Sequence, residues 1–177
     1  GLKGYFSSGS GVASQEQYNS ARGLVKAFAE ERLAIPAVLR LGGNCEEEAI
    51  RILSAYLQDL PARVEGYGRD DPPEKCAARL AELIAENRGA VHEIRPMEEP
   101  RLPDCAYTFA TLTGRLSIDH SRCLHCASKG CLEACGRKIL EADAEGLPVL
   151  AIPEAEAKKG KCTECLACEI FCRFHEQ

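Results

Sequence analysis

Tryptophan is absent from the chain, and aromatic residues make up only 6% of its 177 residues. Proteins that bind single-stranded nucleic acid stack bases on aromatic side chains, and nucleic-acid-binding domains usually carry a clear excess of Lys and Arg. Here the net charge is −5, and neither half of the chain has a basic excess. Nucleic acid is therefore not an expected partner.

Long apolar runs are also missing. No stretch approaches the roughly 20 apolar residues of a membrane-spanning helix, and the segment Gly1–Phe6 shows no apolar run of the secretory type. We therefore expect a soluble, cytoplasmic chain without membrane insertion. A Walker loop, the dinucleotide-binding glycine fingerprint and a Ser/His/Asp set are absent as well, so no autonomous catalytic residue is predicted.

Cysteine, by contrast, is abundant, and eight of the 11 cysteines fall in two short runs. The first run is Cys123-x2-Cys126-x4-Cys131-x3-Cys135, and the second is Cys162-x2-Cys165-x2-Cys168-x3-Cys172. Three cysteines at intervals of two to four residues let one tight loop wrap three iron corners of a cubane cluster, whereas the fourth corner is reached from elsewhere. The eight thiols are therefore a candidate ligand set for two [4Fe-4S] clusters.

Structural zinc and disulfide bonds are the competing interpretations of the same thiols. Zinc sites usually present two C-x2-C pairs separated by a longer spacer, and each run here has one cysteine too many for that pattern. Disulfides are typical of small secreted chains in an oxidising compartment. Iron–sulfur clusters therefore remain the favoured interpretation.

The two runs resemble the ligand pattern of bacterial two-cluster ferredoxins. In that family the last cysteine of each run ligates the other cluster. The resemblance implies that cluster I takes Cys123, Cys126, Cys131 and Cys172, and that cluster II takes Cys162, Cys165, Cys168 and Cys135. Two sites interlocked in this way should form together.

The residues around the runs extend this resemblance. Ser117-Ile118-Asp119 and residues 146–152 look like the short ferredoxin strands that precede each run. Two departures are visible. The x4 gap enlarges the loop Ala127–Gly130, and Gly136 and Arg173 stand where the family often has proline. Apolar side chains are expected to screen the clusters from water, namely Leu124, Leu132, Leu166, Ile170 and Phe171.

The first 90 residues alternate strand and helix signals. Strands are expected over residues 2–6, 35–41 and 62–67. Helices are expected over residues 15–31 and 74–87, and a further helix is expected to start at a cap formed by Asn44. Three β–α units in a row predict a parallel sheet of the α/β class. Three strands are few for such a sheet, so a missing strand or a covering partner is expected. The Ser7–Gly11 segment is predicted as a turn, and residues 7–14 are either a plain turn or an anion-binding loop.

A second resemblance covers this region. The segment Ile35–Asn44, with the Glu-rich helix that follows, looks like the C-terminal flavodoxin-like domain of the succinyl-CoA synthetase β subunit and related ADP-forming acyl-CoA synthetases. The upstream strand with its glycine-rich loop and the ATP-grasp region of those ligases would lie before Gly1, so independent ligase activity is not expected. The resemblance implies a partial flavodoxin-like module, with docking or a CoA-related role.

The chain is accordingly predicted to contain two domains and a linker. They are a partial CoA-ligase-like α/β module over 1–92, a proline-rich linker over 93–106, and an α+β two-cluster ferredoxin-like domain over 107–177. A hairpin is expected over 107–118 and a short helix over 132–144. The basic residues Lys158, Lys159 and Lys161 are most simply a solvated group, although they can also tune cluster II or orient docking.

Three cysteines lie outside the runs. Cys45 stands at a helix start where the dipole can lower its thiol pKa, although an inert turn residue is the simpler interpretation. Cys76 is expected in the core, and the role of Cys105 stays open. A third cluster would need His92 or His120 as a fourth ligand, and the wide spacing disfavours it. His125 and His175 are interpreted as pH-responsive neighbours rather than ligands.

These features predict an electron-transfer iron–sulfur subunit of a cytoplasmic oxidoreductase complex. By family resemblance, the larger redox partner acts on 2-oxo acids or acyl-CoA thioesters, and a hetero-oligomer is expected. One alternative is a subunit that completes a split ADP-forming acyl-CoA synthetase joined to a redox domain. Another is a purely structural role, in which the clusters fold the chain but carry no current.

Overall fold

A computed structural model describes residues 1–10, 16–89, 91–93, 103–104 and 106–175. The chain forms two compact units, Gly1–Pro96 and Met97–Gln177. The boundary between the units falls in the segment 93–106, for which the sequence predicts a linker, and most of that segment lies outside the described residues. The proposed functional residues of the two cysteine runs all fall in the second unit.

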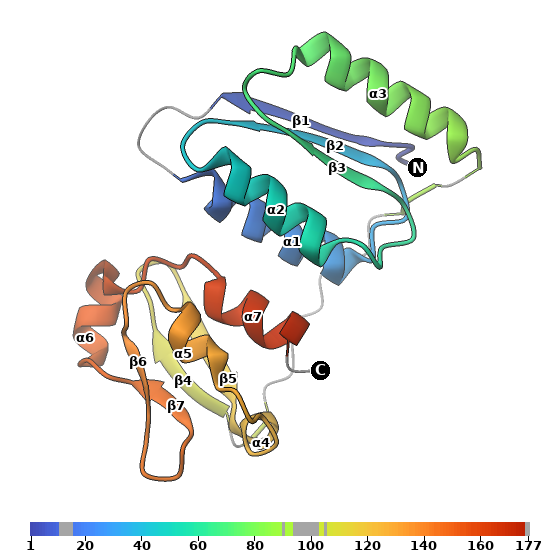
Figure 1. Ribbon diagram of the computed structural model, residues 1–177. Helices are drawn as coiled ribbons and strands as arrows, with labels where there is room; N and C mark the ends of the chain where they lie inside the picture. The colour runs from blue at the N-terminus through green and yellow to red at the C-terminus, as the bar shows by residue number, and fades with distance from the viewer. Residues whose placement is uncertain (11–15, 90, 94–102, 105, 176–177) are drawn as a thin grey trace. The chain divides into compact units, whose positions relative to one another are not determined.

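The first unit is an α/β layer structure built on a parallel sheet (Figure 1). Its strands are β1 (Tyr5–Ser10), β2 (Ala37–Gly42) and β3 (Val64–Tyr67), in the order β1-β2-β3. Helices α1 (Gln17–Glu31) and α2 (Glu46–Tyr56) cover one face of the sheet, and α3 (Pro73–Glu86) covers the other. The predicted parallel α/β arrangement of the first 90 residues is thereby confirmed.

Apolar side chains bury both faces of the central strand β2. Leu39 is completely buried, together with Val25 of α1 and Leu53 of α2. On the opposite side, Val38 packs with Cys76, Leu80 and Leu83 of α3, and Tyr67 and Ile84 border this cluster. Successive residues of a strand point to opposite faces, which is why a nearly continuous apolar run is needed here. The expected core position of Cys76 is confirmed.

Strand β1 lies further along the chain than predicted. The expected turn at Ser7–Gly11 is wrong for its first four residues, because Ser7 to Ser10 continue β1 and pair in parallel with Leu39 to Gly42. The reason is that β2 is a central strand whose backbone groups need partners along its whole length. The remainder of the 7–14 segment lies outside the described residues.

The predicted cap of α2 is also wrong. The helix begins at Glu46, preceded by Cys45 in a left-handed conformation with φ of 55°. Asn44 instead presents its carbonyl oxygen to the backbone N–H of Gln17, at 2.9 Å. The Glu46 carboxylate accepts a hydrogen bond from the N–H of Gly43 at 2.7 Å and another from Arg69 at 3.1 Å. An acidic side chain therefore closes the turn that Asn44 was expected to cap.

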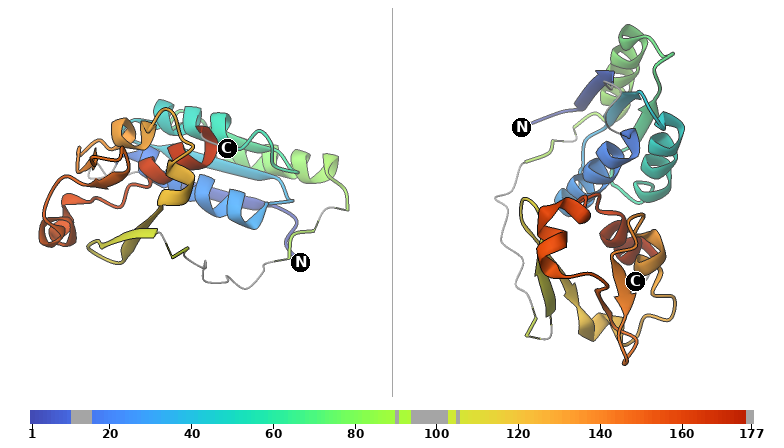
Figure 2. Two further views of the ribbon diagram at one scale, coloured as in Figure 1. Left: turned by 90° about the horizontal axis from the view of Figure 1, so that it is seen from below. Right: turned by 90° about the vertical axis from the view of Figure 1, so that its left-hand side faces the viewer.

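The second unit combines two antiparallel hairpins with short helices (Figure 2). Strands β4 (Ala106–Ala110) and β5 (Arg115–Asp119) pair as the predicted first hairpin, with Tyr107 opposite Ile118. The remaining elements are β6 (Leu140–Ala142), β7 (Pro148–Leu150), α4 (His120–Cys123), α5 (Gly130–Ala134), α6 (Glu154–Glu156), η1 (Ala157–Lys161) and α7 (Ala167–His175). Phe109, Ile139, Leu140 and Ala157 form its buried core.

The helix predicted over 132–144 ends early. Helix α5 stops at Ala134, Cys135 is extended, and Lys138 adopts a positive φ of 52°. The chain then enters β6, and Asp143 closes the turn to β7 by accepting hydrogen bonds from the N–H groups of Glu145 and Leu147. Asp-initiated turns of this kind compete with helix formation. The cysteine that ends the first run is thus carried on extended chain.

In the part of the chain that the structure describes, no helix has the length and apolar character needed to cross a membrane.

Candidate metal centre

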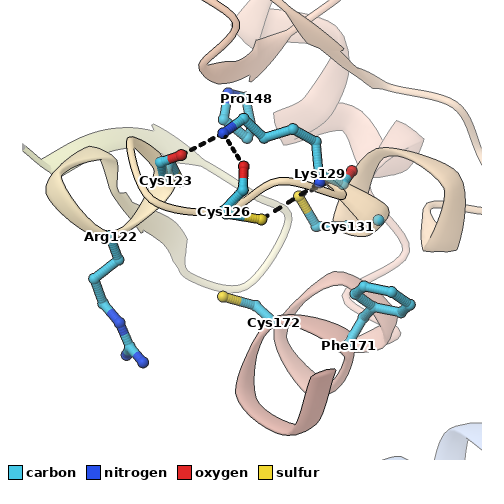
Figure 3. A pocket seen from close by; sticks show the side chains of 9 residues that line it. Arg122, Cys123, Cys126, Lys129, Cys131, Pro148, Phe171 and Cys172 are labelled. Carbon is cyan, nitrogen blue, oxygen red and sulfur yellow. Dashed lines mark hydrogen bonds between the residues drawn. The ribbon is translucent and has the colours of Figure 1, made fainter. Parts of the chain in front are cut away.

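Four cysteines from both runs line one cavity of the second unit. Cys123 ends α4, Cys126 follows in the loop, and Cys131 lies in the first turn of α5. Cys172 reaches the same cavity from α7, as Figure 3 shows. These are the four residues that the ferredoxin resemblance assigns to cluster I.

The other four cysteines also lie near one another. Besides burial, the charges of Cys165 and Cys135 raise the pKa of the Cys162 thiol, and the same two neighbours raise the pKa of Cys168. Cys135, Cys162 and Cys168 also pack against the buried core of the second unit. These are the residues assigned to cluster II, so the structure gathers the eight cysteines of the runs as two groups that exchange their last members.

Close packing between α5 and α7 brings Cys172 to the first run. Gly130, at the start of α5, faces the ring of Phe171, and a Cβ atom at Gly130 would stand only 2.2 Å from that ring. The absence of a side chain at Gly130 therefore lets the two helices approach. Because Cys172 follows Phe171 directly, this contact also sets how near Cys172 comes to Cys131.

The two loops that carry the cysteines share a backbone feature. In each loop, the residue two positions before the third cysteine has a left-handed conformation, Lys129 with φ of 48° and Leu166 with φ of 59°. Glu164, between Cys162 and Cys165, is left-handed as well, with φ of 53°. In the first loop, the backbone N–H of Lys129 donates a hydrogen bond to Sγ of Cys126 at 3.3 Å.

Burial makes the grouped thiols difficult to ionise on their own. It raises the pKa of Cys131 to about 11, with further increases from Cys123, Cys172 and Cys126. Burial likewise raises the pKa of Cys168 to about 12, and Cys165 and Cys135 add to the effect. A bound metal reverses this situation, because a coordinating thiol is deprotonated outright. Each donor set therefore fits a group that supplies positive charge.

The spacing of the thiols separates two kinds of metal group. Among the described residues, no set of three or more His, Cys, Asp or Glu side chains has an arrangement that could hold a metal ion. A zinc site draws four ligands to about 2.3 Å from one ion. A cubane instead places its iron atoms at separate corners, so its four thiolates stand further apart. Whether the four thiols that line the cavity hold a cluster or a single ion is therefore decided by the metal and sulfide content of the protein.

None of the three described histidine side chains, His92, His120 and His125, lines the cavity of the first cysteine group. His125 is exposed, and Nε2 of His120 lies 2.9 Å from the carbonyl oxygen of Pro148, while its ring stacks on Tyr107. His92 is buried in the first unit, where its Nε2 lies 3.7 Å from Glu31. The side chain of His175 and all of Cys105 lie outside the described residues. A third cluster with Cys45, Cys76 and Cys105 finds no support, because Cys76 is enclosed in the α3 core.

The alternative in which a helix dipole lowers the pKa of Cys45 is contradicted. A hydrogen bond with Glu16 is the largest influence and raises the thiol pKa, and the carboxylates of Glu16 and Glu48 act in the same direction. Cys45 is exposed and stands before the helix in a left-handed conformation. The simpler interpretation, an unreactive turn cysteine, is in line with these contacts.

One of the expected screening residues is misplaced. Leu124, which follows the last residue of α4, is 67% exposed and is not among the residues that line the cavity. Ile170 is buried, and Leu132 packs against the core of the second unit. Phe171 lines the cavity and Leu166 is half-buried.

Two charged side chains at the cysteine groups escaped the sequence analysis. The Nζ of Lys129 donates hydrogen bonds to the carbonyl oxygens of Cys123 and Cys126. Glu164 accepts hydrogen bonds from the N–H of Thr113 at 2.8 Å and from its hydroxyl at 2.7 Å. The only available signal was the enlarged x4 loop, which contains Lys129. The basic residues Lys158, Lys159 and Lys161 are exposed, and Lys159 pairs with Glu156 at 3.4 Å.

Comparisons of the chain with protein-family models, with curated proteins and with solved structures returned no match.

Proposed function

We propose that the second unit is a ferredoxin-like domain with two [4Fe-4S] clusters, and that the chain is an electron-transfer subunit of a cytoplasmic oxidoreductase complex. The observation that supports this most strongly is the shared cavity of Cys123, Cys126, Cys131 and Cys172. Exchange of the last cysteine between two runs is the ligand pattern of two-cluster ferredoxins. Two independent zinc sites would not require the last cysteine of each run to be exchanged.

Each cluster, when bound, takes up and releases single electrons. The chain supplies the thiolate ligands, the backbone donors and the apolar surroundings that set how readily this happens. The backbone N–H of Lys129 donates to Sγ of Cys126 at 3.3 Å. Ile170 and Phe109 are buried around the cysteine groups and exclude water from that part of the unit.

Two helices would connect the clusters directly. Helix α5 carries Cys131 of cluster I and leads to Cys135 of cluster II four residues later, and α7 carries Cys168 and Cys172 at the same interval. In α7, four residues correspond to about one helical turn, or roughly 6 Å along the axis, whereas Cys135 follows α5 on extended chain. Ligands of both clusters therefore alternate on one short scaffold. This arrangement suits a relay, since an electron on one cluster has the other close by.

The first unit is proposed as a partial flavodoxin-like module that docks a partner. Strands β1 and β3 are the two edges of a sheet of only three strands, and Tyr5 and Phe6 on β1 are 37% and 41% exposed. Sheet edges in native proteins are normally covered or protected. A larger redox subunit would supply that cover. The resemblance to acyl-CoA synthetases suggests a partner that acts on acyl-CoA thioesters or 2-oxo acids.

A redox titration of the anaerobically purified full chain, followed by electron paramagnetic resonance (EPR), tests the relay. We expect two one-electron reductions per chain in the potential range that ferredoxins use. Cys172→Ser should remove the signal of cluster I, whereas Cys45→Ser, at an exposed position, should leave both signals unchanged. A loaded protein whose clusters cannot be reduced in that range would instead support a structural role.

A further inference from the structure

The two cysteine loops place different side chains at one matched position. In each loop, a left-handed residue precedes the first residue of a helix, and the third cysteine follows directly. This position holds Lys129 before Gly130 and Cys131 in the first loop, and Leu166 before Ala167 and Cys168 in the second. Their backbone conformations agree, with φ of 48° and 59°. The two loops differ in length, but at this matched position the first presents a lysine side chain and the second an apolar one.

Lys129 is held firmly against the first cysteine group. Its half-buried side chain bends back so that Nζ donates to the carbonyl oxygens of Cys123 and Cys126, the latter at 2.7 Å (Figure 3). Its backbone N–H donates to Sγ of Cys126 at 3.3 Å. Lys129 also lines the cavity of that group. A positive charge is thus fixed at the cavity wall by bonds to the same residues that would hold the cluster.

Other charges near the two groups reinforce the difference. Arg122 also lines the first cavity, although Asp119 acts on Cys123 with the opposite sign. Near the second group, the Glu164 carboxylate acts on Cys162, and the matched position is the uncharged Leu166. Two cations, Lys129 and Arg122, therefore line the first cavity, whereas the matched position of the second group carries no charge. Lys161, which precedes Cys162, is exposed.

We propose that Lys129 makes cluster I the cluster of higher reduction potential, so that electrons pass from cluster II to cluster I. This inference rests on the proposed function. Reduction adds one negative charge to a cluster, and a fixed cation in a partly buried site stabilises the reduced form more than the oxidised form. In the transfer, reduced cluster II loses one electron and oxidised cluster I gains it. The donor to cluster II and the acceptor from cluster I are the redox partners of the chain.

Reciprocal exchange of the matched residues tests this assignment. The full-length wild type, Lys129→Leu and Leu166→Lys are purified anaerobically, and both midpoint potentials are measured by EPR-monitored titration. We expect Lys129→Leu to lower the higher midpoint potential and to leave the lower one unchanged. The difference between the two midpoint potentials should therefore decrease. Leu166→Lys should also decrease this difference, by raising the lower potential. Lys129→Arg keeps the charge and should retain most of the wild-type difference.

The outcomes separate this inference from the proposed function. If the wild type holds no reducible cluster, the proposed function fails and the inference fails with it. If two clusters are reduced but the difference between their midpoint potentials is unchanged in Lys129→Leu, the proposed electron-transfer function is retained and the role of Lys129 is overturned. If Lys129→Leu loads only one cluster, Leu166→Lys decides, because an unchanged lower potential in that variant would contradict the effect of charge at the matched position.

Discussion

At the scale of single residues, Glu65 shows how one charged side chain ties a strand to a helix. Its carboxylate on β3 accepts hydrogen bonds from Nε of Arg79 at 3.0 Å and from Nη2 at 2.9 Å, and it also accepts the hydroxyl of Tyr67 at 2.7 Å. The hydrogen bonds from Arg79 are the main reason that the pKa of Glu65 is lowered. Burial, with the same carboxylate, raises the pKa of Tyr67 to about 12.

Glu65→Gln should destabilise the first unit at neutral pH by about 1–2 kcal/mol, because a bidentate charged pair becomes a weaker polar contact. The pKa of Glu65 is lower in the folded chain than in the unfolded chain. Its contribution is therefore complete above the unfolded value near 4.5 and is lost as the pH falls through the folded value. Hydrogen exchange of the most protected amides in β2 and α3, compared between variant and wild type at each pH, measures the difference.

Glu47→Gln is the matched control, since Glu47 is exposed on α2. It should change the exchange rates of the same amides much less. An equal effect of the two variants, or a Glu65→Gln effect that does not shrink as the pH falls below the unfolded value near 4.5, would contradict the role given to the pair with Arg79.

Residue roles differ in how far sequence can predict them. The cysteines could be grouped as candidate ligands because their spacing and chemistry are both visible in the chain. Lys129 and Glu164 could not be assigned in the same way. Their side-chain partners are the carbonyl oxygens of Cys123 and Cys126 and the N–H and hydroxyl of Thr113. Those contacts depend on left-handed backbone conformations at non-glycine residues, which sequence patterns seldom reveal.

At the scale of secondary-structure elements, the contact of α5 with α7 determines whether Cys172 can join the first run. The helices are too short to be stable alone, so packing must hold them. Gly130 and Phe171 form the closest point of that packing. The effect of a single methyl group at this point can therefore be measured on the cluster itself.

Gly130→Ala should accelerate loss of cluster I about tenfold, because overpacking of this kind costs about 1–3 kcal/mol. Alanine favours helices more than glycine does by about 1 kcal/mol, but a Cβ atom 2.2 Å from the Phe171 ring outweighs that gain. The rate is followed as the decay of cluster absorbance in anaerobic chelator. Gly136→Ala, where an added Cβ has open space around it, should decay at the wild-type rate.

A second variant guards against simple misfolding. Gly130→Ala combined with Phe171→Leu removes the ring from the crowded point and should recover much of the wild-type rate. If the double variant is no slower than Gly130→Ala alone, the loss does not arise from the contact between α5 and α7.

Secondary structure could be predicted from the sequence where the apolar residues repeat with a clear helical or strand period. The expected parallel units of residues 1–90 appear because their apolar residues must face the sheet or the helices. The helix predicted over 132–144 failed beyond Ala134 since Cys135 becomes extended and Asp143 closes a hairpin turn. The end of β1 was also misplaced, because Ser7 to Ser10 have little strand propensity and are held in place by pairing with β2. Long-range pairing of this kind overrides local preference.

At the scale of the whole molecule, the chain combines an open three-stranded α/β unit with a unit that gathers eight cysteines. The first unit has two sheet edges to cover, and the second has two groups of thiols that need positive charge. Both features are the grounds for the proposal that the chain is part of a larger redox assembly. The central claim is that the second unit carries two iron–sulfur clusters, and the proposed relay, the effect of Gly130 and the role of Lys129 all depend on it.

Iron, acid-labile sulfide and zinc counted in the anaerobically purified full chain test that claim most directly. Two cubanes with four iron and four sulfide each correspond to about eight iron and about eight sulfide per chain, and the account expects those numbers with little zinc. About two zinc ions per chain without sulfide, as expected for two four-cysteine zinc sites, would contradict it.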